Sequence, residues 1–135
     1  LAPADLTALI DPVLSGRADV SISLRHNAPM VWRWIGLDYI SGERVLPRAL
    51  IVQHLDALAL LPKFGFEVFL NNLITKAQMR IAVVPWPRVE SPLKSRKYGL
   101  WAGIKGDLGM IRDMLHAVSV WGLLRQITEM RRLRR

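Results

Sequence analysis

The sequence predicts an α/β protein, because amphipathic helical segments alternate with short segments of strand pattern. Residues 3–14 repeat apolar side chains at steps of three and four, which is the period of a helix. Residues 18–24 then alternate valine, isoleucine and leucine with polar residues, which is the period of a strand. Residues 79–89 contain a second segment rich in β-branched residues. A helix that leads directly into a strand indicates a layer of helices on a sheet.

The first predicted helix carries signals at both of its ends. Pro3 suits the first helical turn, Asp5 lies near the positive end of the helix dipole, and Gly16 follows the last apolar residue. The strand that follows is expected to have one polar face. That face consists of Asp19, Ser21 and Ser23.

Two further helices are expected between the two strands. Residues 46–61 place leucine, isoleucine and histidine side chains at helical spacing behind Pro47, and this pattern predicts one continuous helix. A second helix begins after Gly65. The prolines within residues 79–89 confine the end of that strand to an edge of the sheet or to its exit.

Residues 107–135 predict a long amphipathic helix with a basic end. Its apolar face consists of Met110, Ile111, Met114, Leu115, Val118, Trp121, Leu124 and Ile127. From Arg88 onwards the chain has eleven Lys and Arg residues against four Asp and Glu, so seven of the eight net positive charges lie there. Such a basic segment indicates an anionic partner: a phosphorylated substrate, acidic lipid head groups or nucleic acid.

The composition excludes several classes of protein. The absence of cysteine rules out disulfide scaffolds, cysteine zinc sites and thiol nucleophiles. No apolar segment reaches the roughly 18 residues that cross a bilayer. The three histidines lack metal-ligand spacing, and no nucleophile-elbow or phosphate-loop motif is present. The hydrophobic fraction of 51% is high for one domain of 135 residues and suggests a membrane-facing surface or a missing partner half.

Two acidic residues in apolar surroundings are candidates for a site. Asp38 lies between Leu37 and Tyr39, where a carboxyl group can have a raised pKa and act as general base for a hydroxyl, or can cap the following turn. Glu67 follows two aromatic residues, and it either points into a site or pairs with a basic residue such as Arg44.

The residues after Asp38 and a later basic cluster are further candidates. Ser41-Gly42 permits a tight turn, and Glu43 with Arg44 can hold each other, a hydroxyl-bearing substrate or a phosphate, or can form a solvated loop. The basic cluster can clamp a diphosphate or form a solvated charge run. It consists of Lys94, Arg96 and Lys97.

Taken in order, these segments resemble the second half of a family 2 glycosyltransferase with the GT-A fold, the class that includes polyprenyl-phosphate sugar transferases. The matching runs include I-D-P-V-L-S-G-R-A-D-V-S-I-S, D-Y-I-S-G-E-R-V-L-P-R, F-G-F-E-V-F-L-N, I-A-V-V-P and K-S-R-K-Y-G-L-W-A-G, and they extend to about residue 115. The resemblance implies a partial GT-A domain over residues 1–106, with a mixed sheet flanked by helices. The basic amphipathic helix of residues 107–135 follows it.

The resemblance also implies roles for particular residues. Asp38 is the expected catalytic base or acceptor-orienting group. Ser41, Gly42, Glu43 and Arg44 would line the acceptor pocket with Glu67 beside it, and Lys94 and Lys97 would bind the donor phosphates. No metal ligand is assigned within this chain, because Glu90-Ser91-Pro92 stands where some relatives have His or Asn.

The implied reaction moves a sugar from a nucleotide-sugar donor to a hydroxyl or lipid-phosphate acceptor. The Mg²⁺ or Mn²⁺ ion of this family is held mainly by an Asp-x-Asp motif in a first half that has no counterpart here, so this chain alone is expected to be inactive. Because the chain begins with Leu1, we expect a fragment or a processed product. Strand 18–24 and helix 46–61 would pack against the missing half.

The expected location is cytoplasmic, at the inner face of a membrane. The alternative is a non-enzymatic basic helical module that binds nucleic acid or an anionic membrane. Nucleic acid is the less favoured partner, because aromatic residues are not interleaved with the basic cluster.

Overall fold

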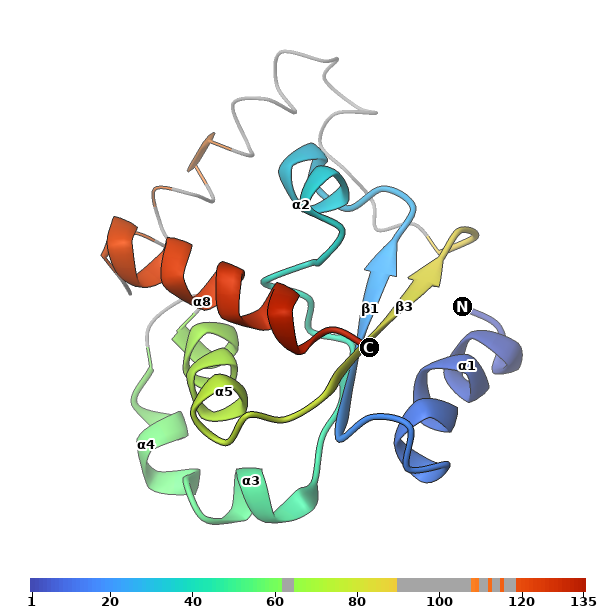
Figure 1. The fold of residues 1–135 in the computed structure, drawn as a ribbon, viewed down its shortest axis with the longest axis horizontal. Helices are drawn as coiled ribbons and strands as arrows, with labels where there is room; N and C mark the ends of the chain where they lie inside the picture. The colour runs from blue at the N-terminus through green and yellow to red at the C-terminus, as the bar shows by residue number, and fades with distance from the viewer. Residues whose placement is uncertain (62–64, 90–107, 110–111, 113–114, 116–118) are drawn as a thin grey trace.

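A computed structural model describes residues 1–61, 65–89, 108–109, 112, 115 and 119–135. A three-stranded sheet lies at its centre, with helices on both faces (Figure 1). The elements are α1 (Pro3–Leu14), β1 (Val20–Arg25), α2 (Met30–Ile35), β2 (Arg44–Val45), α3 (Arg48–Val52), α4 (Leu55–Ala59), α5 (Gly65–Lys76), β3 (Ile81–Trp86) and α8 (Val120–Leu133). The α/β class predicted from the sequence is confirmed.

The sheet is mixed, with the strand order β2-β1-β3. The short strand β2 runs antiparallel to β1, with Ser21 opposite Val45, while β3 runs parallel to β1 along all six residues of each strand. Strand β3 is therefore an edge of the described sheet, as its prolines predicted. A single bridge between Ile81 and Arg134 attaches the C-terminal end of the chain to the start of β3.

Helix α1 begins and ends where the sequence predicts, and it covers one face of the sheet. The Asp5 carboxylate accepts a hydrogen bond of 2.7 Å from the N–H of Ala2, which satisfies a free donor at the helix start. Gly16 has a φ of +76°, a conformation that glycine adopts without strain. The indole N–H of Trp86 donates to the Asp5 carbonyl at 3.0 Å, so the end of β3 is fixed to α1.

The polar face of β1 is partly buried beneath other parts of the chain. Ser21 and Ser23 have no exposed surface, whereas Asp19 at the start of the strand is half-buried. Burial is tolerated because the Ser21 hydroxyl donates to the Leu9 carbonyl and the Ser23 hydroxyl bonds to Ser41. The expectation that this strand packs against a missing half is therefore wrong, since this chain covers both faces of β1.

The hydrophobic core lies on the other face of the sheet, between the strands and helices α2, α5 and α8 (Figure 1). Val20 and Ile22 point into it from β1, and the rings of Trp32 and Tyr39 pack there with centroids 5.7 Å apart. The remaining buried members are Leu37, Val68, Ile74, Ile81, Leu123, Met130 and Leu133. Helix α5 is thus confirmed as a helix with one buried face.

The predicted continuous helix over residues 46–61 is wrong, because the chain forms two short helices, α3 and α4, with a break at Gln53 and His54. The His54 ring nitrogen Nδ1 lies 3.0 Å from the Leu50 carbonyl, which a continuous helix would use for a backbone bond. The His54 backbone N–H donates to Ile51 instead, and its ring packs edge-on against Phe69 of α5. Neither short helix has a fully buried residue.

Helix α8 confirms the C-terminal helix over residues 120–133, while most of residues 107–118 lie outside the described part of the chain. The Ser119 hydroxyl accepts a bond of 3.1 Å from the N–H of Gly122 and caps the helix start. Of the predicted apolar face, Trp121 and Leu124 are 82% and 50% exposed, so this part of the face does not pack into the core. The buried residues of this helix are Leu123, Met130 and Leu133.

Candidate functional site

A cluster of polar side chains lies where β1 ends and the chain enters β2. We call it the polar cluster, and it consists of Ser23, Arg25, Asp38, Ser41, Glu43, Arg44 and Asn71. Gly36, in the left-handed conformation with φ of +77°, ends α2 and turns the chain inward. Leu37, Asp38 and Tyr39 are consequently all buried. Apolar neighbours on both sides of Asp38 thus carry a carboxylate into the protein interior.

Asp38 is a fully buried acidic residue with few compensating contacts. Arg25 Nη2 lies 3.7 Å from Asp38 Oδ2, which makes an ion pair at the outer limit of direct contact. Within the part of the chain that the structure describes, neither carboxylate oxygen accepts a hydrogen bond of normal geometry. Burial raises the pKa of Asp38, while the positive charge of Arg25 and the nearby backbone N–H of Ile40 oppose this rise. Both oxygens therefore retain the capacity to accept a proton or a hydrogen bond.

Glu43 is joined to β1 through two serines. Its Oε2 atom accepts hydrogen bonds from the hydroxyls of Ser23 at 3.1 Å and Ser41 at 3.0 Å. The two hydroxyl oxygens also lie 2.9 Å apart, and because each hydroxyl has one proton, two of these three contacts are hydrogen bonds at any one time. The other carboxylate oxygen, Oε1, lies 3.7 Å from Arg25 Nη1, so Arg25 lies between Glu43 and Asp38. The two carboxylates are thus linked through one guanidinium group.

Arg44 turns away from Glu43 and contacts α5. Its Nη1 atom donates to the side-chain oxygen of Asn71 at 2.5 Å, and its Nη2 atom donates to the Tyr39 carbonyl at 2.9 Å. The Asn71 amide donates to the same Tyr39 carbonyl at 2.8 Å. Successive residues of an extended chain point to opposite faces, which explains why Glu43 and Arg44 form no direct ion pair. The interpretation that these two side chains hold each other is therefore wrong.

The negative charge of Glu67 favours the charged form of Arg44 without a direct contact between the two side chains. Desolvation lowers the pKa of Arg44 to about 10, and the negative charge of Glu67 is the largest influence in the opposite direction, followed by that of Asp38. Glu67 lies in the first turn of α5, one helical turn before Asn71. The described residues show no ion pair between Glu67 and Arg44. Glu67 therefore lies beside the polar cluster without a direct bond to it.

Several members of this network were not identified from the sequence. Ser23 and Arg25 occupy alternate positions on β1, so the strand period places them on the same face. Asn71 follows Glu67 at the i+4 position, so the helix period places these two on the same face of α5. Both patterns could have identified these residues as neighbours of the predicted site. The hydroxyl of Tyr39 donates to the side chain of Gln126 on α8, and burial raises the pKa of Tyr39 to about 12. No local pattern links Tyr39 to a residue so distant in sequence.

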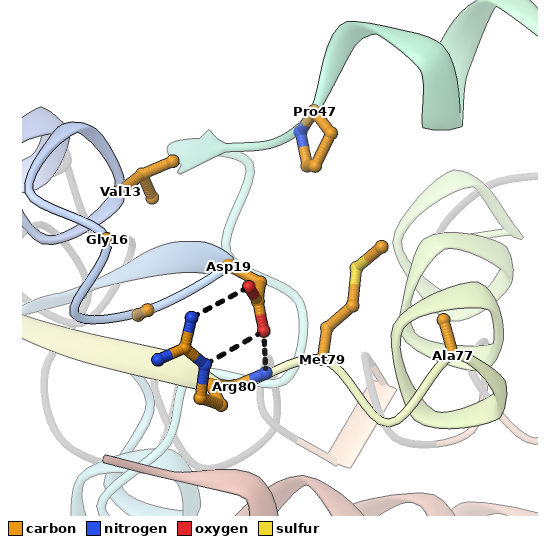
Figure 2. A pocket seen from close by; sticks show the side chains of 8 residues that line it. Val13, Gly16, Asp19, Pro47, Ala77, Met79 and Arg80 are labelled. Atoms are coloured by element: carbon orange, nitrogen blue, oxygen red, sulfur yellow. Dashed lines mark hydrogen bonds and ion pairs between the residues drawn. The ribbon is translucent and has the colours of Figure 1, made fainter.

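A separate hollow of about 450 Å³ lies at the opposite end of the parallel strands. Figure 2 shows the carboxylate of Asp19 facing the guanidinium of Arg80 beside Gly16, Pro47 and Met79. Arg80 donates three hydrogen bonds of 2.8 to 3.2 Å to Asp19, and these bonds lower the pKa of the Asp19 carboxyl. In open α/β sheets, ligands usually bind at the carboxyl ends of the parallel strands. The polar cluster lies at that end of the sheet, whereas this hollow lies at the other end.

The other predicted site residues are placed as follows. Gly42 is exposed at the edge of the cluster, whereas Lys94 and Lys97 lie outside the described residues. No group of three His, Cys, Asp or Glu side chains among the described residues comes together in a way that could hold a metal ion. The Mg²⁺ or Mn²⁺ ion implied by the resemblance stays a prediction, because its ligands are expected mostly outside this chain.

Known proteins give no further guidance on this site. Comparisons with protein-family models, with curated proteins and with solved structures found no match. Among the described residues, no helix combines the length and the apolar character needed to cross a membrane.

Proposed function

We propose that this chain is the acceptor-side part of a GT-A glycosyltransferase, which transfers a sugar from a nucleotide-sugar donor to a hydroxyl or lipid-phosphate acceptor. The observation that carries the proposal is the convergence of Asp38, Ser41, Glu43 and Arg44 on one polar cluster at the carboxyl end of β1. Glu67 adds a further acidic group beside it. Buried ionisable groups that are only partly compensated are typical of functional sites.

The proposed chemistry for a hydroxyl acceptor requires a base, and Asp38 suits this role. As the acceptor oxygen bonds to the sugar carbon, the bond from that carbon to the donor diphosphate breaks and the hydroxyl proton moves to Asp38. The raised pKa of Asp38 favours uptake of this proton. Arg25, 3.7 Å away, stabilises the carboxylate before the reaction. A phosphate acceptor would need no base, and a cationic side chain such as Arg25 could then bind it.

Access to Asp38 requires a movement of the loop in this proposal. Asp38 is fully buried, whereas the side chain of Glu43 is 38% exposed, so an acceptor meets Glu43 first. Gly42 between Ser41 and Glu43 is exposed, and a Cβ atom placed on it would meet no other atom within 4 Å. The loop therefore has free space on its outer side.

The test measures sugar transfer by the full-length protein that contains this chain, with a panel of UDP- and GDP-sugars and release of the nucleoside diphosphate as the readout. Asp38→Asn is expected to lower the rate about a hundredfold or more, as for loss of a general base. Asp11→Asn, an exposed aspartate on α1, is the matched control and should leave the rate unchanged.

Three outcomes would contradict the proposal or part of it. A loss of rate in Glu43→Gln together with full activity in Asp38→Asn would assign the base to Glu43. Equal loss in Asp38→Asn and Asp11→Asn would show a general effect on folding. No release from any donor would favour the non-enzymatic alternative.

A further inference from the structure

The outer face of α8 is apolar at its start and basic towards its end. Val120, Trp121 and Leu124 are exposed there, although a helix of a globular domain usually directs such residues into the core. Arg125, Arg131 and Arg132 follow within the next turns and are also exposed. The inner face of the same helix is already occupied by the hydrophobic core. These apolar residues therefore form a second stripe that the described part of the chain leaves uncovered.

The charge of this region is strongly unbalanced. Helix α8 and the two residues after it contain five arginines and a single acidic residue, Glu129. Glu129 is paired with Arg132 at 3.0 Å. Arg125, Arg131 and Arg135 form no ion pair with any other described residue. These three arginines therefore have no ion-pair partner within the described part of the chain and can meet an anionic partner close to the apolar stripe.

We propose that the outer face of α8 binds an anionic membrane surface. Trp121 and Leu124 would enter the boundary between head groups and acyl chains, where an amphipathic indole ring is favoured, and the arginines would contact lipid phosphates. The apolar stripe has only three residues, far fewer than the roughly 20–30 residues that each partner contributes to a stable protein interface. Leucine and valine have no partner in a nucleic-acid backbone, so lipid fits the combination better.

The same helix connects this surface with the polar cluster. On its inner side, Gln126 accepts the hydrogen bond from Tyr39, and Met130 and Leu133 are buried in the core. Helix α8 and helix α1 lie on opposite sides of the sheet in Figure 1. A bound α8 would hold the loop around Asp38 at a fixed distance from the lipid surface. Membrane binding itself does not depend on the proposed function.

The test is cosedimentation of this chain with vesicles of phosphatidylcholine alone and of phosphatidylcholine mixed with phosphatidylglycerol. Binding is expected on the mixed vesicles only and should weaken as salt is added. Trp121→Ala should weaken binding about tenfold, and Leu124→Ala should weaken it by a smaller factor. The matched control is Leu14→Ala, because Leu14 is an exposed leucine on α1, on the other side of the sheet. It should bind like the unmodified chain.

The charge contribution is measured with Arg125→Gln and Arg131→Gln. Each should weaken binding about fivefold, since one basic residue near an anionic surface contributes about 1 kcal/mol. Arg48→Gln, an exposed arginine at the start of α3, is the matched control. All variants alter exposed side chains, and circular dichroism checks that they remain folded.

Four results would overturn the proposal. The chain could fail to bind the mixed vesicles, or it could bind neutral vesicles equally well at high salt. Leu14→Ala and Leu124→Ala could weaken binding equally. The chain could also self-associate in a way that Trp121→Ala abolishes. Tighter binding to a DNA or RNA oligonucleotide than to the mixed vesicles, lost with the arginines but retained in Trp121→Ala, would instead support a nucleic-acid surface.

Discussion

Replacing Arg44 with methionine should destabilise the protein by about 3 kcal/mol, because Arg44 ties the loop before β2 to helix α5. Methionine keeps an unbranched apolar side chain and removes the guanidinium. The substitution eliminates the two bonds to Asn71 and to the Tyr39 carbonyl, and a third from Nε to the Ser41 carbonyl at 2.5 Å. The acceptors would remain in a buried or half-buried environment with fewer donors.

The magnitude follows from two opposing contributions. Hydrogen bonds from a charged donor contribute about 1.5–3 kcal/mol each to the free energy of unfolding. Desolvation of the guanidinium opposes them, and it lowers the pKa of Arg44 from 12.5 to about 10. This shift corresponds to about 3–4 kcal/mol before screening, and to less once screening by the water that reaches the side chain is taken into account. The three hydrogen bonds therefore contribute more free energy than desolvation of the guanidinium costs. The difference is similar to the roughly 3 kcal/mol that is lost when one partner of a buried charged network is removed.

Urea unfolding followed by far-UV circular dichroism measures this difference. The midpoint should fall in Arg44→Met while the slope stays the same, which indicates a change in stability alone. Arg48→Met is the control, since Arg48 is exposed and its loss should change stability by no more than about 0.5 kcal/mol. A loss below about 1 kcal/mol in Arg44→Met, or equal losses in both variants, would refute the reasoning.

Three further changes test the electrostatics and the capping described above. Burial raises the pKa of Asp38, so its contribution to stability is present below the usual pKa of 3.8 and is lost as pH rises through the folded-state pKa. The stability of Asp38→Asn relative to the unmodified chain should therefore increase from about pH 4 to pH 7 in urea titrations, and a decrease over this interval would contradict this assignment. Hydrogen bonds from Arg80 lower the pKa of Asp19, so its contribution is present above 3.8 and is lost as pH falls through the lowered pKa. Asp19→Asn should be less stable at neutral pH and equal to the unmodified chain in strong acid, as thermal melts at several pH values would show, whereas a difference that persists in acid would rule out the ion pair as its cause. Ser119→Ala should lower the free energy of unfolding by about 1 kcal/mol, because it removes the hydrogen bond from Gly122, and Ser119→Thr should retain most of this stability. Equal stability of Ser119→Ala and the unmodified chain in urea titrations would show that packing alone holds the start of α8.

Local signals in the sequence were sufficient for several elements. Helix α1 begins at Pro3 and ends just before Gly16, as its end signals predicted, and the alternation in β1 identified a strand. The prolines near β3 correctly indicated an edge strand. These predictions succeeded because helix termini and strand alternation depend on neighbouring residues, whose conformational preferences act without the rest of the fold.

The break between α3 and α4 shows where local signals failed. The leucine spacing favoured one helix, but the His54 ring packs against Phe69 of α5 and its Nδ1 atom lies beside the Leu50 carbonyl. A contact with a residue of another helix thus decided the conformation of a segment whose own pattern pointed elsewhere. Tertiary contacts commonly override a weak helical preference in this way.

For the candidate site, too, local sequence patterns predicted some features and tertiary contacts decided the others. The sequence alone identified Asp38 as an acidic residue between apolar neighbours, and it identified Ser41, Glu43 and Arg44 as a polar interruption of an apolar region. It could not assign Glu43 to Ser23 of β1 and Arg44 to Asn71, because this depends on which face of the extended chain each residue occupies once β2 pairs with β1.

The sequence by itself therefore determined the α/β class, the ends of the first helix, the positions of β1 and β3, and the basic character of the C-terminal region. Only the tertiary structure decided that Ser21 and Ser23 are buried, and that α8 packs through Leu123 and Met130 while Trp121 remains exposed. The physical reason is that a periodic pattern fixes which residues share a face, whereas the face that is buried depends on the position of elements distant in sequence.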